Sequence, residues 1–470
     1  MLFSSLFFLQ VFLPVLLILY YLLPKNIRIR NLLLLLASLV FYAWGEPEKI
    51  AILLISVAVN YCIGIFGLRF DLSDRMRKGV LTGGILLNIS ILCGFKYAIP
   101  VCVFFDEWFH FKFHIPNGEL PLGISFYTFQ IISYLIDLYR KEIEPQRNLG
   151  KLALYITFFP QLIAGPIIKY HDVFLQLNSR EAKADDIAIG IKRFICGLSK
   201  KVLLANSFAV AADDIFQMPY DRLDTLTAWI GAGCYSLQIY FDFSGYSDMA
   251  IGLGRMFGFR FLENFNLPYS SQSIREFWRR WHISLSTWFK EYLYIPLGGN
   301  RCSAARNCLN IMIVFLATGI WHGAALNFVC WGIFYGILIV AERLFLGQML
   351  ERCRWKIIPH FYTLFAVVMA WVLFRADSLP EAWQYWMKML TVTSNPELHC
   401  SDFFSPGFLA AAAVGVLLCF PFQKMFPVFT EQFCYGKIRI AEIPILLLML
   451  AAVIVQLSGN TYNPFIYFRF

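Results

Sequence analysis

Long apolar segments separated by short polar and basic segments run through the whole chain. The apolar segments lie at residues 2–23, 31–44, 50–68, 80–95, 122–139, 152–168, 187–212, 226–240, 249–261, 310–321, 326–341, 357–374, 408–420 and 443–457. A helix needs about 20 apolar residues to cross roughly 30 Å of hydrocarbon, so several of these segments are too short for a full span. The pattern therefore predicts about 11–14 membrane elements, the short ones re-entering the membrane around a cavity.

Composition supports the same class. The chain has 470 residues, of which 59% are hydrophobic and 15% charged, with a mean hydropathy of +0.60. Such a chain is too apolar to be soluble, and we expect an all-α polytopic membrane protein forming one domain over residues 1–470. The net charge of +9 does not indicate nucleic-acid binding, because the basic residues cluster in the short segments between apolar ones.

Basic clusters also predict the topology. Clusters at residues 25–30, 69–78 and 140–151 follow every second apolar segment and are expected on the cytoplasmic side, which puts the N-terminus outside the cell. Residues 2–23 have no basic residue before them and no small-residue cleavage site, which favours a retained first span over a signal peptide. Membrane lipids are therefore expected partners.

Residues 267–301 form the most polar stretch at predicted membrane depth, and we expect an amphipathic or re-entrant catalytic region there. If residues 274–294 form one helix, five polar positions share a face: Arg275, Arg279, His282, Ser286 and Lys290. One interpretation is an interfacial helix whose cations reach lipid phosphates. The other is a cationic groove, with Arg280 alongside, that binds a phosphate-bearing acyl donor, because arginine can clamp phosphate oxygens bidentately.

A second histidine, His322, lies inside an apolar segment. It follows Arg306 by 16 positions, which corresponds to roughly 24 Å of helix at 1.5 Å per residue. It could be a helix–helix hydrogen bonder. It could also be a general base that takes a proton from a hydroxyl, and the flanking Gly319 and Gly323 leave room for close approach of backbone or substrate.

Further polar residues interrupt apolar segments, and Gln161, Asp242 and Asp248 are examples. The two aspartates are expected to begin a helix or to pair with an arginine. The 7 histidines and 12 cysteines show no metal-ligand spacing, so no metal site is predicted. The sequence contains no GxSxG, HExxH or phosphate-binding loop, which favours direct acyl transfer assisted by a base over an acyl-enzyme.

Seven motifs, in order, resemble the membrane-bound O-acyltransferase family and within it the bacterial alginate O-acetyltransferase branch. They are SFYTFQIISYLIDLYR, FFPQLIAGPI, YFDFSGYSDMAIGLGRMFGF, FWRRWHISLSTWFKEYLYIPLGGNR, GIWHGAALNFVCWGIFYG, LFRA at 373–376 and NPFIYFRF at 463–470. The resemblance implies a ring of tilted helices with a central funnel. It implies His322 as the catalytic residue, His282 as the second family histidine, and Trp321, Asn327, Asp242 and Gln161 as tunnel or support residues.

The resemblance also implies the reaction. An acyl group, expected to be acetyl, passes from a cytoplasmic thioester through the membrane to a hydroxyl outside the cell. The donor is expected to be acetyl-CoA or an acylated phosphopantetheine carrier such as an acyl carrier protein, with no permanently bound cofactor. The acceptor is expected to be a surface glycan or an extracytoplasmic SGNH-type partner protein, and the location the bacterial inner membrane.

Three other functions remain open at this point. One is D-alanyl transfer to teichoic acid, in which a small carrier protein brings the thioester on a phosphopantetheine arm. Another is transport of a lipid or glycan without chemistry, although the chain shows no internal repeat of the kind that many transporters contain. The third is a structural scaffold for a secretion complex.

Overall fold

The computed structural model describes residues 1–69, 71–109, 120–396, 398, 403–420, 436–459 and 462–464, and the described residues contain helices but no strand. The chain divides into two compact units. Unit 1 comprises Met1–Ile191 and Ala250–Leu262, and unit 2 comprises Lys192–Met249 and Glu263–Phe470. The helices α9 (Ala184–Ser199) and α11 (Thr225–Met256) contribute residues to both. The single domain expected over residues 1–470 stays a prediction.

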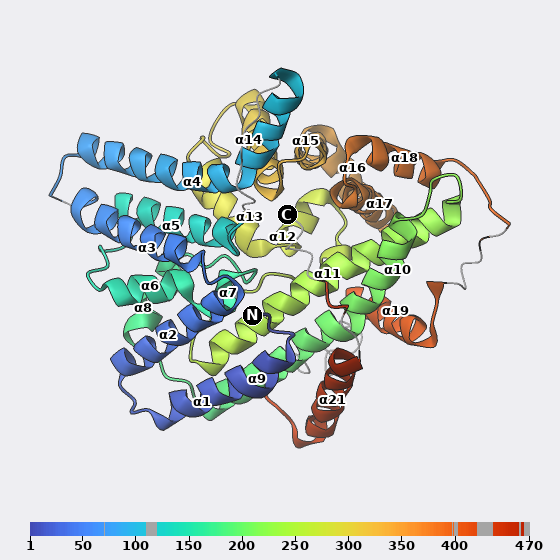
Figure 1. The fold of residues 1–470 in the computed structure, drawn as a ribbon. Helices are drawn as coiled ribbons and strands as arrows, with labels where there is room; N and C mark the ends of the chain where they lie inside the picture. Colours follow the sequence, from blue (N-terminus) through green and yellow to red (C-terminus); the bar gives the residue numbers. More distant parts are fainter. Residues whose placement is uncertain are drawn as a thin grey trace. The chain divides into compact units, whose positions relative to one another are not determined.

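Unit 1 contains the N-terminal helices, drawn in blue to teal in Figure 1. They are η1 (Phe8–Phe12), α1 (Leu13–Leu22), α2 (Ile27–Gly45), α3 (Ile50–Cys62), η2 (Ile63–Gly67), α4 (Asp74–Phe109), α5 (Ile124–Tyr139), α6 (Leu149–Thr157), α7 (Phe159–Leu162) and α8 (Tyr170–Asn178). The apolar segment predicted at 152–168 is broken: α6 ends at Thr157 and helix resumes only for the four residues of α7. Pro160 has no N–H to donate to the carbonyl oxygen of Ile156, and its ring would clash with that carbonyl in a continuous helix, which explains the break.

Unit 2 contains the remaining helices. They are η3 (Lys200–Ala205), α10 (Asn206–Phe216), η4 (Pro268–Ser270), α12 (Ile274–Arg280), α13 (Ile283–Phe289), η5 (Lys290–Tyr294), α14 (Ala304–His322), α15 (Leu326–Ala341), η6 (Glu342–Leu346), α16 (Gly347–Arg352), α17 (Ile357–Arg375), α18 (Leu379–Leu390), α19 (Pro406–Cys419), η9 (Ile440–Glu442) and α21 (Ile443–Gly459). A large aromatic core that includes Trp278, Trp331 and Trp371 holds α12, α15 and α17 together.

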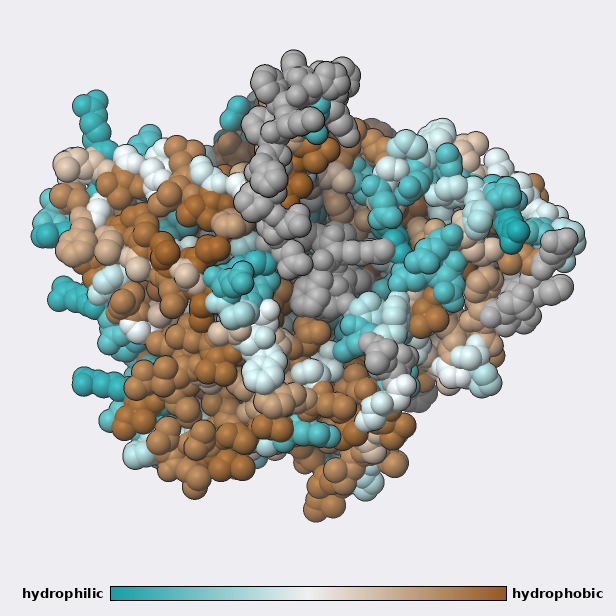
Figure 2. All heavy atoms as spheres, in the orientation of Figure 1, coloured by the Kyte–Doolittle hydropathy of each residue, from teal (hydrophilic) through white to brown (hydrophobic). Residues whose placement is uncertain are grey.

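Eight described helices are long and apolar enough to cross a membrane. They are Ile27–Gly45, Ile50–Gly67, Asp74–Val103, Ala184–Phe216, Ala304–His322, Leu326–Arg352, Ile357–Arg375 and Ile440–Gly459, and two shorter apolar helices are Phe8–Leu22 and Pro406–Cys419. Large apolar side chains such as Ile18, Leu32 and Leu36 are exposed on α1 and α2, where Figure 2 shows a broad hydrophobic surface. A face of this kind is stable only against lipid or protein, which confirms a multi-pass membrane protein.

The segments predicted at 226–240 and 249–261 correspond to one continuous helix, α11, so neither Asp242 nor Asp248 begins a helix. Both aspartates instead pair with cations in unit 2. Asp242 lies 2.7 Å from the Nζ of Lys201, and Asp248 lies 2.8 Å from a guanidinium nitrogen of Arg193. The sequence prediction of pairing is therefore confirmed for Asp248 with an arginine, while the partner of Asp242 is a lysine. Buried carboxylates persist in apolar surroundings only with such partners.

Asp248 is expected to be important for stability. One oxygen of its carboxylate accepts a hydrogen bond from Arg193, and the other accepts from the Nζ of Lys200 at 2.7 Å. All three side chains are largely buried. Breaking a buried ion pair by removing one partner lowers the free energy of unfolding by about 3–5 kcal/mol. We expect a loss of this size for Asp248→Asn. The measurement is the melting temperature of the purified protein in detergent, which should fall. Asp71→Asn is the control, because Asp71 pairs on the surface with Arg69, and its melting temperature should not change.

Candidate active site

His322 is the last residue of α14, a continuous helix that begins after the N-cap Ser303. The helical path assumed between Arg306 and His322 is therefore confirmed. His322 is 8% exposed, and its ring packs nearly perpendicular to two aromatic rings that also contact each other, with its centroid 5.1 Å from that of Trp331 and 5.1 Å from that of Phe374. The two rings fix the plane of the imidazole, which is the first requirement for directed proton transfer.

Close packing of α14 against α15 fixes the position of His322 along its helix. A Cβ atom on Gly319 would lie 2.4 Å from the carbonyl oxygen of Phe328, and one on Gly323 would lie 2.3 Å from the ring of Phe328. A larger residue at either position would clash with Phe328, so α14 and α15 could not pack this closely. The expected close approach at these glycines is made by the protein's own chain.

Asn327 also stabilises the structure around His322. This residue is 2% exposed at the start of α15, and its Nδ2 donates to the carbonyl oxygens of Ala376 at 2.6 Å and Leu373 at 3.3 Å. The two carbonyls belong to the last turn of α17, where backbone acceptors lack helical partners. Asn327 thus holds the backbone that carries Phe374, whose ring contacts His322.

The single helix considered for residues 274–294 is wrong. The first part, α12, ends at Arg280, Trp281 is extended, and His282 adopts a left-handed conformation with φ of 45° before α13 begins. The periodicity of one helix therefore does not carry through the segment. Left-handed backbone is costly for a residue with a Cβ and persists only where the surroundings fix it.

His282 is almost completely buried, with 1% exposure, and its Nδ1 lies 3.2 Å from Oδ1 of Asn264. The ring of Phe243 packs on it edge to face at 4.7 Å. Burial lowers the pKa of His282 to about 3, because an apolar environment disfavours the imidazolium ion. His282 is therefore a neutral imidazole at physiological pH.

The other polar positions of the predicted face come together around a cavity of 490 Å³ within unit 2. Its lining includes the cations Arg275, Arg279 and Lys290, the polar residues Ser286 and Thr318, and an apolar wall formed in part by Trp278, Phe289 and Phe315. None of the described lining residues is acidic. The cavity is therefore suited to a ligand with an anionic end and an apolar or flexible arm.

Arg275 and Arg279 lie one turn apart on α12, and a carboxylate holds the start of this helix. The carboxylate of Glu342 accepts from the backbone N–H groups of Ile274 at 2.6 Å and Arg275 at 3.0 Å, which caps the start of α12 from η6. Arg280, by contrast, is not among the lining residues, and it pairs with Glu276 at 2.9 Å. Arg280 is thus turned to a neighbouring carboxylate instead of the cavity.

The remaining predicted support residues lie elsewhere. Trp321 is buried beside His322, with ring centroids 4.7 Å apart. Asp242 is paired with Lys201, which also donates to Oδ1 of Asn206 at 3.1 Å. Gln161 is buried in α7 of unit 1, where its Nε2 donates to the carbonyl oxygen of Tyr155. Of these three, Trp321 contacts the predicted catalytic residue His322 directly.

A charged cluster in unit 1 was not predicted. Asp137, Glu142 and His171 place possible metal-ligand atoms within 4.8 Å of one another. His171, however, pairs through Nδ1 with Asp137 at 3.0 Å and through Nε2 with Asp172 at 3.2 Å, and these hydrogen bonds raise its pKa to about 10. The two carboxylates stabilise the imidazolium ion of His171, so these residues form an ion-pair cluster.

Sequence reasoning also missed Asn264 and Glu342, which lie next to the predicted site. Neither belongs to a recognisable spacing: Asn264 precedes His282 by 18 positions and Glu342 follows Arg275 by 67 positions in the chain. An isolated asparagine in a loop carries no pattern that could have indicated this role.

Comparison with known proteins identifies the family. Residues 140–379 match the membrane-bound O-acyltransferase family. A Pseudomonas putida protein named probable alginate O-acetylase AlgI is 39% identical over the full length of both chains. The Helicobacter pylori peptidoglycan O-acetyltransferase is 36% identical, covering 81% of this chain and 78% of its own, and the Bacillus subtilis teichoic acid D-alanyltransferase is 27% identical, covering 59% and 74%.

The fold and these matches define a multi-pass helical membrane enzyme that acylates hydroxyl groups. The chain belongs to the membrane-bound O-acyltransferase family, as the sequence motifs predicted, and is an O-acyltransferase.

Proposed function

We propose that the protein moves an acetyl group from a cytoplasmic thioester, acetyl-CoA or an acylated phosphopantetheine carrier, through the inner membrane to a hydroxyl outside the cell. The observation that carries the proposal is the cationic cavity of unit 2, which has Arg275 and Arg279 on one side and Thr318 of α14 on another. Thr318 precedes His322 by four positions, one helical turn, so the cavity approaches the predicted base.

The shape and charge of the cavity suit the donor. Its 490 Å³ lies within the roughly 300–1,000 Å³ typical of small-molecule sites. The guanidinium groups can bind phosphate oxygens of the donor, and the apolar wall can cover the pantetheine arm. We infer that the donor binds here on loading and leaves after transfer, with no permanently bound cofactor.

His322 is proposed as the general base. Its imidazole takes the proton of the acceptor hydroxyl as the oxygen attacks the carbonyl carbon of the thioester. The new C–O bond forms, the C–S bond breaks, and the imidazolium returns the proton to the departing sulfur, so the thiol leaves and the base is regenerated. The rings of Trp331 and Phe374 keep the imidazole in the plane that this transfer requires.

The acceptor is proposed to be a surface polysaccharide, reached directly or through an extracytoplasmic SGNH-type partner protein. The relatives that cover most or all of this chain are named for acetyl transfer to alginate or peptidoglycan, whereas the relative named for D-alanyl transfer is 27% identical over 59% of it. Acetyl is therefore favoured over D-alanyl. The N-terminus is proposed to lie outside the cell, as the basic clusters predict.

The test is the acyl content of the surface glycans in cells that lack the protein, with and without the wild-type gene restored. Mild base releases ester-linked groups, and the released acid is identified by mass. We expect acetate to be lost in the deletion strain and restored by the wild type. Release of alanine in this pattern would support D-alanyl transfer, and unchanged esters would reject acyl transfer to a surface glycan.

A further inference from the structure

Three residues around the start of the last sequence motif are bound to one helical stretch of unit 2. They are Tyr462, Asn463 and Pro464, which we call the anchor segment. The carbonyl oxygen of Pro464 accepts a hydrogen bond from Nζ of Lys201 on η3. The Oδ1 of Asn463 accepts from Nδ2 of Asn206, at the start of α10, at 3.2 Å. Lys201 and Asn206 are almost completely buried, so both bonds are made away from water.

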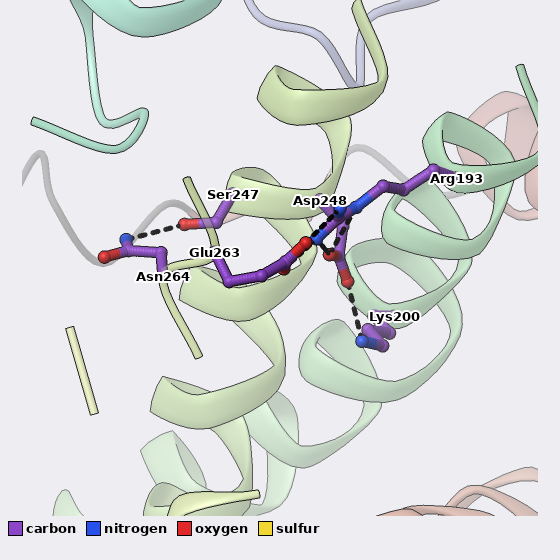
Figure 3. A network of polar contacts seen from close by, with 6 residues as sticks. All are labelled: Arg193, Lys200, Ser247, Asp248, Glu263 and Asn264. Carbon is purple, nitrogen blue, oxygen red and sulfur yellow. Dashed lines mark hydrogen bonds and ion pairs between the residues drawn. The ribbon is translucent and has the colours of Figure 1, made fainter. Parts of the chain in front are cut away.

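The helical stretch that binds the anchor segment is itself held by ion pairs. The Nζ of Lys201 lies 2.7 Å from a carboxylate oxygen of Asp242 on α11, and the adjacent Lys200 lies 2.7 Å from Asp248 on the same helix. Figure 3 shows Lys200 of η3 and Arg193 of α9 converging on the carboxylate of Asp248. Since these pairs are buried and costly to break, the anchor segment is bound to a fixed support.

Tyr462 of the anchor segment binds a further ion pair. Its hydroxyl donates to Oδ2 of Asp213 on α10, and Oδ1 of the same carboxylate accepts from Nη2 of Arg375 at 2.6 Å. Arg375 is the last residue of α17, and its guanidinium also packs over the ring of Phe216 at 5.3 Å. Its Nε has no hydrogen-bond partner among the described residues. Tyr462 therefore occupies the carboxylate oxygen that could otherwise bind this Nε.

The end of α17 connects Arg375 to His322. The residue before Arg375 is Phe374, whose ring centroid lies 5.1 Å from that of His322 and 5.2 Å from that of Trp331. Asn327 holds this turn from α15 through two hydrogen bonds to its backbone, and Arg375 ties the same turn to α10. The position of the Phe374 ring against the imidazole therefore depends on both attachments.

We propose that Tyr462 is a positioning residue that acts on His322 through Asp213 and the end of α17. By binding one oxygen of Asp213, its hydroxyl keeps Arg375 on the other oxygen. Without the hydroxyl, the freed carboxylate turns to bind Arg375 through both Nη2 and Nε, the bidentate geometry that arginine and carboxylate prefer. That change moves the last turn of α17 and the ring of Phe374. The consequence for catalysis rests on the proposed role of His322 as general base, whereas the coupling of Tyr462 to the imidazole does not.

The first test is the kinetics of Tyr462→Phe, which removes the hydroxyl and keeps the ring. We expect kcat to fall by about 3- to 10-fold, less than the roughly 10²-fold that a 1 Å displacement of reacting groups can cost. The donor KM should stay within about twofold of the wild-type value, because Tyr462, Asp213 and Arg375 do not line the donor cavity. Initial rates are measured on the full-length protein in lipid nanodiscs, with acetyl-CoA as donor and base-deacetylated surface polysaccharide as acceptor.

The second test observes His322 directly by nuclear magnetic resonance of protein with ¹³C- and ¹⁵N-labelled histidine. The chain has 7 histidines, and the signal of His322 is identified as the one missing in His322→Gln. An aromatic ring shifts the signals of the groups that it contacts, so a displaced Phe374 changes the His322 signal. We expect this signal to move in Tyr462→Phe. It should keep its wild-type position in the control Tyr220→Phe, which removes a hydroxyl of the same unit that donates to a backbone carbonyl on α18.

A double-mutant cycle tests whether Asp213 carries the effect. Asp213→Asn removes the charge that binds Arg375, and adding Tyr462→Phe to it should lower kcat by less than about twofold further, since changes that act through one contact are not additive. An equal fall of kcat on adding Tyr462→Phe to either background would overturn the inference. If Asp213→Asn does not fold, the two measurements on Tyr462→Phe decide.

The outcomes separate this inference from the proposed function. An unchanged kcat or an unchanged His322 signal in Tyr462→Phe would refute the positioning role. A rise in donor KM without a fall in kcat would assign Tyr462 to donor binding and refute it equally. If the wild type transfers no acetyl group, the proposed function fails, and the His322 signal still tests the coupling. If the wild type is active and the signal does not move, the inference alone fails.

Discussion

Substitution of His322 by alanine is expected to lower acyl transfer by about 10²- to 10⁴-fold, the contribution of a positioned general base. The expected loss follows from the geometry of the site. The imidazole packs edge to face against Trp331 and against Phe374, and an alanine leaves no titratable group at the end of α14. The measurement is the rate of acetyl transfer by membranes that contain equal amounts of the two proteins.

A histidine outside the site provides the control. His360 lies on α17, where its Nδ1 faces the carbonyl oxygen of Ser271 at 3.2 Å, and it is not in contact with His322 in the aromatic cluster. The transfer rate of His360→Ala is expected to stay within about threefold of the wild-type rate, because His360 has no proposed part in proton transfer. Robust transfer by well-expressed His322→Ala would exclude His322 as the base and would assign proton transfer to another group.

Removal of two cations from the donor cavity is expected to weaken donor binding strongly. A hydrogen bond to a charged group contributes about 1.5–3 kcal/mol, and about 1.4 kcal/mol corresponds to a tenfold change in affinity. Arg275→Gln combined with Arg279→Gln should therefore raise the KM for the thioester donor by about 100-fold or more, with a smaller change in kcat. The measurement is initial rate against donor concentration in purified enzyme.

The matched control removes two cations of the same region that do not line the cavity. Arg301 and Arg306 are exposed, and neither is among its lining residues. Arg301→Gln with Arg306→Gln changes the net charge equally, so any general effect of charge on the anionic donor appears in both variants. Equal donor KM values for the two double variants would reject the cavity as the phosphate site.

The sequence by itself determined the class of protein and the family. Apolar length, basic clusters and motif order can be recognised without knowledge of packing, and the helical path assumed between Arg306 and His322 is confirmed in α14. They also placed Arg275, Arg279, Ser286 and Lys290 together, and all four line one cavity. These four residues come from α12, α13 and η5 and not from the single helix that the spacing assumed.

Only the tertiary structure decided how His282 is presented. A 100° periodicity describes residues of one helix, and it fails where long-range contacts break the helix, as Asn264 does by binding Ile283 and Ser284. The same limit explains α11, which the polar residues Asp242 and Asp248 appeared to divide in the sequence: it continues because Lys201 and Arg193 neutralise them. The sequence specifies which polar groups are buried, whereas packing specifies their partners and therefore their chemistry.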